Sequence, residues 1–155
     1  MIYGNVLESE LKSKLDKDHT TGKQKSLSSF TRKELTADMI RQYKEKYKLM
    51  KHIDPKDEIK YAWFDGDNLV AYLILNHNDG KVLWITALEV TPEYRGYQLG
   101  NQLIDFATLQ GAQALAVAKD NEIAIKMYES KGFKISEESK KDVKSGKKNN
   151  YLMYK

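Results

Sequence analysis

Arg95, Gly96 and Gly100 stand where an apolar, strand-like run ending at Val90 gives way to a helical pattern that begins near Leu99. The first amides of a helix have no acceptor within the helix, and its N-terminus carries partial positive charge, so an anion binds readily there. Glycine lets a ligand or a neighbouring strand approach the backbone closely. The segment therefore predicts a phosphate-binding turn, although a plain strand-to-helix turn with glycines explains the same pattern.

A second group of residues that could do chemistry begins at Asn121. Asparagine is a good helix N-cap, because its side-chain oxygen accepts a hydrogen bond from a first-turn amide. Tyr128 lies four residues after Ala124, a spacing that brings both to one face of a helix, and Gly132 ends that helix. From the residues alone, Tyr128 is either one more packing residue of the helix or a catalytic residue.

The residue types that are missing narrow the chemistry further. The chain has no cysteine, which excludes disulfides, Cys-ligated zinc and an acyl group carried on a protein thiol. Its three histidines, His19, His52 and His77, are scattered at spacings that match no metal site. We therefore expect no metal.

Length and charge indicate one ordinary globular domain spanning residues 1–155. Hydrophobic residues make up 41% of the chain and charged residues 31%, which is typical of a packed domain. The net charge of +4 comes from 23 lysines and only 3 arginines, so the surface attracts anions but lacks the guanidinium groups that read nucleic-acid bases. Residues 140–148 (KKDVKSGKK) are interpreted as a solvated loop, with anion binding as the alternative. Nucleic acid is not an expected partner.

The first residues, MIYGNVLESE, show no signal pattern, and no run approaches the roughly 18 apolar residues that span a bilayer. We expect a cytoplasmic protein with no membrane partner. Residues 12–29 are polar and rich in Lys and Ser, which is typical of a surface segment.

Hydrophobic periodicity indicates which elements position the two groups of residues. Thr31-x-x-Glu34 predicts a capping box before the first helix, and the apolar run Val82–Val90 predicts a central strand. Asn78-Asp79-Gly80 predicts a hairpin turn. The predicted elements are a helix over about 36–50, strands over 61–64, 69–75 and 82–90, a helix over about 99–111, a strand over 114–118, a helix from 121 to 132, and strands over 133–136 and 151–154. This order predicts an α/β arrangement with a mostly antiparallel first half and a strand–helix–strand unit in the middle.

Together the two groups of residues resemble the motifs of the GNAT superfamily, the general N-acetyltransferases that use acetyl-CoA. The strand ending at Val90, followed by Pro92 and Tyr94-Arg95-Gly96, is similar to the family's pyrophosphate loop, Arg/Gln-x-x-Gly-x-Gly/Ala. The second motif is matched at the family's spacing by Asn121, Ala124, Tyr128 and Gly132-Phe133. The likeness covers roughly residues 60–137, while residues 1–29 match nothing in the family.

The resemblance implies a mixed α/β (α+β) fold whose mostly antiparallel central sheet, of about six or seven strands, is flanked by helices. It implies an N-acetyltransferase that moves an acetyl group from acetyl-CoA directly to a primary amine of a small molecule or peptide. Tyr128 would be the catalytic residue that protonates the leaving thiolate. The residues implied to bind acetyl-CoA are Leu88, Glu89, Val90, Arg95, Gly96, Tyr97, Gln98, Leu99, Gly100, Asn101 and Asn121. A homodimer is an open alternative to a monomer.

Two positions depart from the family's pattern. Gln98 stands where the loop pattern has its first glycine, and Ala116 stands where some members that act on protein N-termini have a glutamate base. The general base therefore stays open between Glu89 and a chain of water molecules. These departures also keep open a module that binds acyl-CoA but catalyses weakly. By the resemblance, residues 30–60 and 136–151 build the acceptor pocket, but their sequence does not indicate the acceptor.

Overall fold

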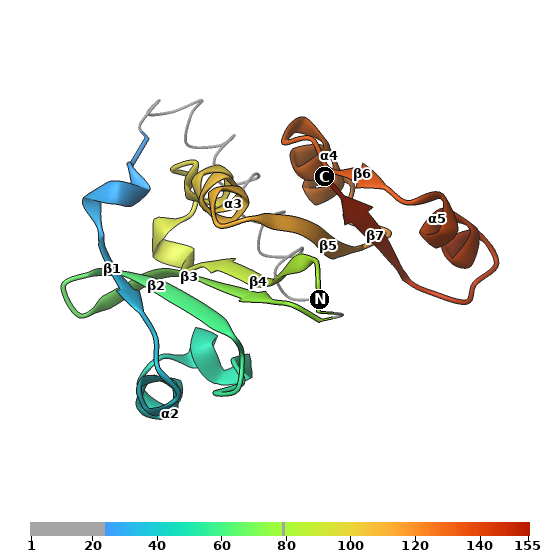
Figure 1. Ribbon diagram of the computed structural model, residues 1–155. Helices are drawn as coiled ribbons and strands as arrows, with labels where there is room; N and C mark the ends of the chain where they lie inside the picture. The colour runs from blue at the N-terminus through green and yellow to red at the C-terminus, as the bar shows by residue number, and fades with distance from the viewer. Residues whose placement is uncertain (1–23, 79) are drawn as a thin grey trace.

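The computed structural model describes residues 24–78 and 80–155, which form one seven-stranded sheet in the order β1-β2-β3-β4-β5-β7-β6 (Figure 1). Elements labelled η are short 3-10 helices. The elements are η1 (Leu27–Ser29), β1 (Thr31–Glu34), α2 (Ala37–Lys46), η2 (Lys48–His52), β2 (Ile59–Asp65), β3 (Asn68–Asn76), β4 (Leu83–Val90), η3 (Pro92–Tyr94), α3 (Leu99–Leu109), β5 (Ala112–Ala118), α4 (Glu122–Ser130), β6 (Lys134–Ile135), α5 (Glu137–Lys144) and β7 (Asn150–Tyr154).

The sheet is antiparallel throughout except for one pair in its middle. Strands β1 to β4 form an antiparallel meander, and β5, β7 and β6 form a second antiparallel group. The single parallel pair, β4 with β5, joins the two groups, and α3 makes the connection between its strands. The expected fold, a mostly antiparallel mixed sheet flanked by helices, is confirmed.

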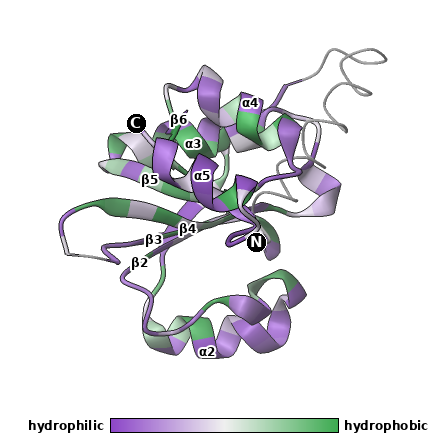
Figure 2. Cartoon of the chain, turned by 90° about the vertical axis from the view of Figure 1, so that its right-hand side faces the viewer, coloured by the Kyte–Doolittle hydropathy of each residue, from purple (hydrophilic) through white to green (hydrophobic). Residues whose placement is uncertain are grey.

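The sheet has apolar residues on both faces, and each face carries its own core. Helices α3 and α4 lie on one side of the sheet and α2 lies on the other (Figure 2). The α3 side buries residues such as Leu73, Leu88 and Leu103, and the α2 side buries Ile40 and Phe64. Strands covered on both faces read as nearly continuous apolar runs, which is why Val82–Val90 was recognisable as a central strand.

The predicted capping box at Thr31-x-x-Glu34 is wrong, because these residues form the edge strand β1. The cap belongs to Thr36 instead, whose Oγ1 accepts a hydrogen bond from the Met39 amide at 3.2 Å. Two threonines a few residues apart offer the same capping chemistry, and pairing of 31–34 with β2 decides between them. The helix predicted over 36–50 is divided into α2 and η2.

The interpretation of residues 140–148 as a loop is also wrong in part, because α5 runs through Lys144. Ser136 caps this helix, its Oγ accepting from the Ser139 amide at 3.1 Å. Acidic residues lie in the first turn and basic residues in the last, which matches the helix dipole. Counting charge over residues 140–148 concealed this pattern, because the acidic first turn lies before residue 140. Strand β6 has only two residues, whereas four were predicted over 133–136.

Some predictions fall on residues that the structure does not describe. Most of the polar segment 12–29, residue His19 and the centre of the turn at 78–80 lie outside the described ranges. Within those ranges, no helix is long and apolar enough to cross a membrane. Within residues 24–78 and 80–155, no group of three or more His, Asp or Glu side chains is placed to hold a metal ion.

Candidate functional site

Strands β4 and β5 pair over only part of their length. Their parallel ladder joins Leu83 to Ala112 and ends where Ile85 pairs with Leu115, although the strands continue to Val90 and Ala118. Beyond this point the β4 edge that faces β5 has no strand partner among the described residues. An unpaired strand edge presents a row of backbone N–H and C=O groups to any extended ligand. Strands β4 and β5, which lead to the two groups of candidate residues, therefore part before they end.

Thr86 marks the place where the strands part. It is the first residue of β4 after the last pair with β5. On the other edge of β4 the register with β3 shifts here, because Leu75 pairs with Ile85 and Ile74 pairs with Ala87. Thr86 is thus an extra residue, a β-bulge, and its Oγ1 accepts a hydrogen bond from Asn76 Nδ2 at 2.9 Å.

The three predicted ligand-binding residues of β4 divide between the two faces of the sheet. Leu88 and Val90 are buried in the core on the α3 side. Glu89, only 5% exposed, pairs with Tyr72 of β3, and the Tyr72 hydroxyl donates a 2.6 Å hydrogen bond to Glu89 Oε2. Sequence reasoning missed Tyr72, since this partnership depends on the β3–β4 register.

Burial controls the ionisation of this pair. It raises the pKa of Glu89, although the hydrogen bond from Tyr72 and the nearby positive charge of Arg95 act in the opposite direction. Burial, with the neighbouring Glu89 charge, also raises the pKa of Tyr72, so the phenol stays a donor. A carboxyl group with a raised pKa can exchange a proton nearer neutral pH than an exposed one.

The segment after β4 forms a turn that leads into α3. The Thr91 amide donates to the Val70 carbonyl at 2.8 Å, and Thr91 Oγ1 donates to the Leu69 carbonyl at 2.7 Å, so β3 holds the start of the turn. Arg95 Nε donates to the Val90 carbonyl at 3.0 Å. Gly96 has a φ of 87°, a conformation that suits glycine. The turn is thus fixed at the end of β4 where β4 and β5 are apart.

Gln98 keeps a glycine-like backbone without being glycine. With a φ of 63° it is the single non-glycine residue with positive φ in the described part of the chain. A left-handed conformation costs a residue with a side chain about 1–2 kcal/mol. The Gln98 carbonyl accepts hydrogen bonds from the Gln102 amide at 3.4 Å and from Gln102 Nε2 at 3.3 Å. Gln98 therefore adopts a conformation that is strained for a residue with a side chain and that glycine adopts without strain.

Helix α3 begins directly after Gln98. The amide of Gln102 is the first that bonds back to a helical carbonyl, so those of Leu99, Gly100 and Asn101 have no acceptor within the helix. Leu99 and Gly100 are buried, which fixes the first turn against the core. The predicted loop residues are thus brought together at one helix N-terminus, where an anion is favoured.

Asn121 follows the other strand of the opening and lies three residues after the end of β5. It is 2% exposed, and its Oδ1 accepts from the Ala124 amide at 3.2 Å, which confirms the predicted N-cap. Its Nδ2 is buried and has no hydrogen-bond partner among the described residues. Buried polar groups normally have a partner, so this unused donor fits a ligand in the opening.

Tyr128 is fully buried in the core on the α3 side. Its ring packs edge-on against Phe133, with the centroids 6.1 Å apart. The packing interpretation of Tyr128 is therefore confirmed. Its role as a proton donor stays a prediction.

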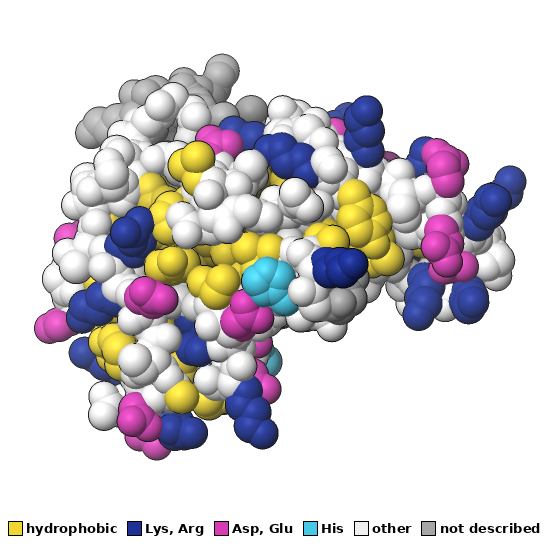
Figure 3. Space-filling view, in the orientation of Figure 1, with side chains coloured by type: hydrophobic (Ala, Val, Ile, Leu, Met, Phe, Trp, Pro, Cys, Tyr) yellow, Lys and Arg dark blue, Asp and Glu magenta, His cyan; other side chains and the backbone are white. Residues whose placement is uncertain are grey.

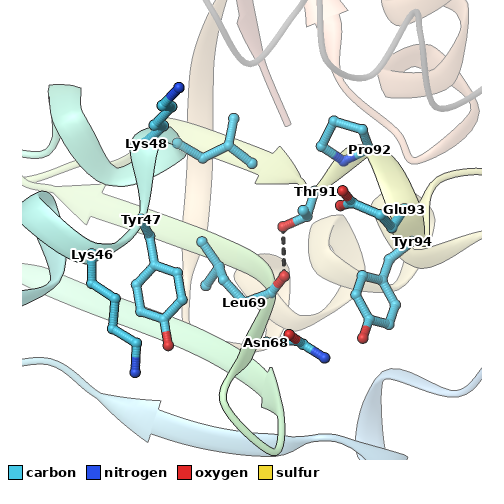
Figure 4. A pocket seen from close by; sticks show the side chains of 10 residues that line it. Lys46, Tyr47, Lys48, Asn68, Leu69, Thr91, Pro92, Glu93 and Tyr94 are labelled. Carbon is cyan, nitrogen blue, oxygen red and sulfur yellow. Dashed lines mark hydrogen bonds between the residues drawn. The ribbon is translucent and has the colours of Figure 1, made fainter.

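Two pockets lie in the regions expected to build an acceptor site. One, of about 650 Å³, lies between the end of α2 and the turn after β4, with Tyr47 and Tyr94 on opposite walls (Figure 4). The other, of about 360 Å³, lies beside α5 and is bordered by Ala116, Asp142 and Lys148. Ala116 directly follows Leu115, the last residue of β5 that pairs with β4, so the second pocket adjoins the point where the strands part.

One face of the molecule is chemically mixed. In the space-filling view, hydrophobic side chains form a band across the middle of the molecule, and charged side chains of both signs surround it (Figure 3). No feature of this surface singles out an acceptor. Apart from Pro92, Tyr94 and Ala116, the residues that line these pockets belong to no motif and come from separate elements, so sequence reasoning did not single them out.

Comparison with known proteins agrees with this geometry. The profile described as the acetyltransferase (GNAT) family matches residues 24–133. No curated protein matches the chain.

Among solved structures, a GNAT family acetyltransferase from Elizabethkingia anophelis with acetyl-CoA bound has a TM-score of 0.52 and 16% identity, covering 70% of this chain and 78% of its own. An N-acetyltransferase from Staphylococcus aureus Mu50 has a TM-score of 0.56 and 18% identity, covering 81% and 96%. The ribosomal-protein-S18-alanine N-acetyltransferase from Escherichia coli has a TM-score of 0.54 and 16% identity, covering 80% and 91%. At these identities the structures establish a shared fold.

Proposed function

Since the chain belongs to the GNAT acetyltransferase family, we propose that it transfers the acetyl group of acetyl-CoA directly to a primary amine of a small molecule or peptide. The observation that carries this proposal is the parting of β4 and β5 beside the N-terminus of α3. The proposal treats residues 1–155 as one catalytic domain in the cytoplasm.

The residues of the opening fit acetyl-CoA in three places. The free edge of β4 at Leu88–Val90 can pair with the amide-bearing arm of the coenzyme as an added strand would. The turn from Arg95 to Asn101 offers amides and a helix N-terminus to its pyrophosphate. The buried Nδ2 of Asn121 offers a donor to a carbonyl of the arm.

Acetyl-CoA supplies an activated acetyl thioester, and the protein must then control three charges. A backbone N–H on the free edge of β4 can stabilise the carbonyl oxygen as it gains negative charge. Tyr128 donates a proton to the departing thiolate, because a phenol of pKa near 10 suits a thiol leaving group of comparable pKa. The amine attacks directly, since the chain has no cysteine to carry the acetyl group. We place the amine in the pocket bordered by Ala116, which adjoins the parted strands.

The base that removes the amine proton is the open step. Glu89 has a raised pKa, which favours it, but its carboxylate is held by Tyr72 on the face away from α3. A chain of water molecules is the competing route. A pH–rate profile of the Glu89→Gln protein separates them, since an unchanged profile removes Glu89 from the proton path.

Two measurements test the proposal. Calorimetry should detect acetyl-CoA binding, and absence of binding at millimolar concentration contradicts the proposal. Free thiol should then be released from acetyl-CoA in the presence of a reactive member of a panel of primary amines.

A module that binds acyl-CoA with little catalysis is the second candidate. Strain at Gln98 and the lack of a carboxylate at Ala116 favour it. Thiol release that depends on an added amine rejects this candidate, while binding without such release supports it.

A further inference from the structure

Residues 25–27, called here the strap, lie across the first turn of α3. The side chain of Gln102 holds the strap at two points, its Oε1 accepting from the Leu27 amide and its Nε2 donating to the Lys25 carbonyl, both at 2.7 Å. The Lys25 amide in turn donates to the Tyr97 carbonyl at 3.4 Å. Leu27 is 6% exposed and belongs to the core on the α3 side. The strap is thus fixed beside the turn that precedes α3.

This arrangement places the side chain of Lys25 against the same turn. Its Nζ lies 4.9 Å from the centroid of the Tyr97 ring, within the range of a cation–π contact. Tyr97 stands between Gly96 and Gln98, whose backbones bend the turn into the helix. The Lys25 side chain is exposed, so its ammonium group can move from the ring to an anion bound at the turn.

The turn has one cation of its own, and a donor of that cation is engaged elsewhere. Arg95 is the single Lys or Arg in residues 90–101, a segment that also contains Glu93. The Arg95 Nε is bonded to the Val90 carbonyl, and its positive charge acts on the buried carboxyl of Glu89, whose pKa it lowers against the effect of burial. The Nε side of the guanidinium is therefore engaged at the end of β4.

We propose that Lys25 supplies the mobile cation for the coenzyme's phosphate groups, and that Gln102 is the positioning residue that holds it there. This inference rests on the proposed function, since it takes the turn before α3 as the site of acetyl-CoA. It gives a role in binding to a segment that matches none of the sequence motifs.

The test is calorimetry with acetyl-CoA at low and at physiological salt. Lys25→Gln should bind about 3- to 10-fold more weakly at low salt, with a smaller loss at physiological salt, because salt screens an exposed charge. Lys25→Arg should stay within about twofold of wild type, since it keeps the charge. Lys33 provides a matched control: its Nζ also lies 4.9 Å from a ring centroid, that of Phe64, whose ring packs in the core on the α2 side. Lys33→Gln should bind like wild type.

A double-mutant cycle tests the role of Gln102. Gln102→Leu removes both hydrogen bonds to the strap and should weaken binding by an amount similar to Lys25→Gln. Combining the two changes should add little further loss, because both act through one ammonium group. A purely structural effect of Gln102 would instead add to that of Lys25→Gln and would be independent of salt, which would overturn the positioning role.

The outcomes separate this inference from the proposed function. If wild type binds acetyl-CoA and Lys25→Gln binds equally well at low salt, the role of Lys25 is wrong and the proposed function stands. If wild type itself fails to bind, both are wrong. Thermal unfolding of each variant checks that it is folded, which is expected for Lys25→Gln because the side chain is exposed.

Discussion

The two edges of β4 differ in a way that separates structure from function. Toward β3, the strand is paired from Trp84 to Val90, with the buried Tyr72–Glu89 hydrogen bond among these pairs. Toward β5, pairing stops at Ile85; β4 then leads into the turn before α3, and β5 leads to Asn121 with its buried, unused amide donor. The same strand is thus a central structural element on one side and an open template on the other.

Removing the Tyr128 hydroxyl tests the open side most strongly. Tyr128→Phe should reduce amine-dependent thiol release about 100-fold if the chemical step limits the rate, because the thiolate loses its proton donor. The affinity for acetyl-CoA should stay close to wild type. Steady-state kinetics measures the rate of thiol release, and calorimetry measures the affinity for acetyl-CoA. Full turnover by the variant would show that Tyr128 has a packing role and no role as a proton donor.

Glu89→Gln tests the edge of β4 that is paired with β3, through the pH dependence of the free energy of unfolding. Burial raises the pKa of Glu89 in the folded chain above its ordinary value of 4.5, which the unfolded chain keeps. At a pH between the unfolded-state pKa and the folded-state pKa, the folded chain therefore binds more protons than the unfolded chain. The free energy of unfolding of the wild type should therefore fall as pH rises from the pKa of Glu89 in the unfolded chain to that in the folded chain, by about 1.4 kcal/mol for each pH unit between them. In Glu89→Gln, which has no carboxyl group at this position, this decrease in the free energy of unfolding with rising pH should be absent.

Urea unfolding between pH 4 and pH 8 makes the comparison. Glu93→Gln, a change at an exposed residue of the following turn, serves as the control and should keep the wild-type pH dependence. Identical pH dependence in wild type and Glu89→Gln would show that the buried carboxyl has no raised pKa.

Asn121 can be changed so that its cap and its unused donor are separated. Asn121→Ser keeps an oxygen that caps α4 but lacks Nδ2, so stability should stay within about 0.5 kcal/mol of wild type. Acetyl-CoA binding should weaken about 3- to 10-fold, because a buried donor to the ligand is lost. Asn121→Ala should lose both, with about 1 kcal/mol of stability. Unchanged binding by both variants would make Asn121 a cap and nothing more.

Gln98→Gly should give the smallest effect, and the effect should be favourable. Glycine adopts the positive φ without strain, although it loses more entropy on folding, so we expect a net gain of at most about 1 kcal/mol. Gln110 is the matched control, since it ends the same helix with an ordinary φ of −77°. Gln110→Gly should not be stabilising in thermal unfolding, and a loss of stability in Gln98→Gly would show that its side chain compensates for the strain.

Sequence reasoning succeeded where function and local structure use the same residues. The apolar run ending at Val90 predicted both the central strand and the start of the turn, and Asn121 predicted a helix cap that the structure confirms. It failed for Thr31–Glu34 and for α5, where strand pairing or charge placement along a helix decided between two local possibilities.

The rest of the site depends on contacts that no spacing reveals. Tyr72 meets Glu89 only through the register of two strands. Lys25 and Gln102 are 77 residues apart in the chain, and they meet only because the fold brings the strap against α3. Tyr128 shows the limit of spacing in another way, because its position in the helix is compatible both with packing, which the structure confirms, and with catalysis, which stays a prediction.

The bulge at Thr86 also determines which side chains of β4 lie on each face of the sheet. In a regular strand, alternate residues share a face, so Ile85 and Leu88, three apart, would point to opposite sides. The extra residue restores both to the α3 core and directs Glu89 toward Tyr72. If Thr86 stayed in the chain but the bulge were straightened into regular pairing, everything downstream in the strand would exchange faces, sending the carboxylate into the apolar layer beneath α3 and the side chains of Leu88 and Val90 to the opposite face.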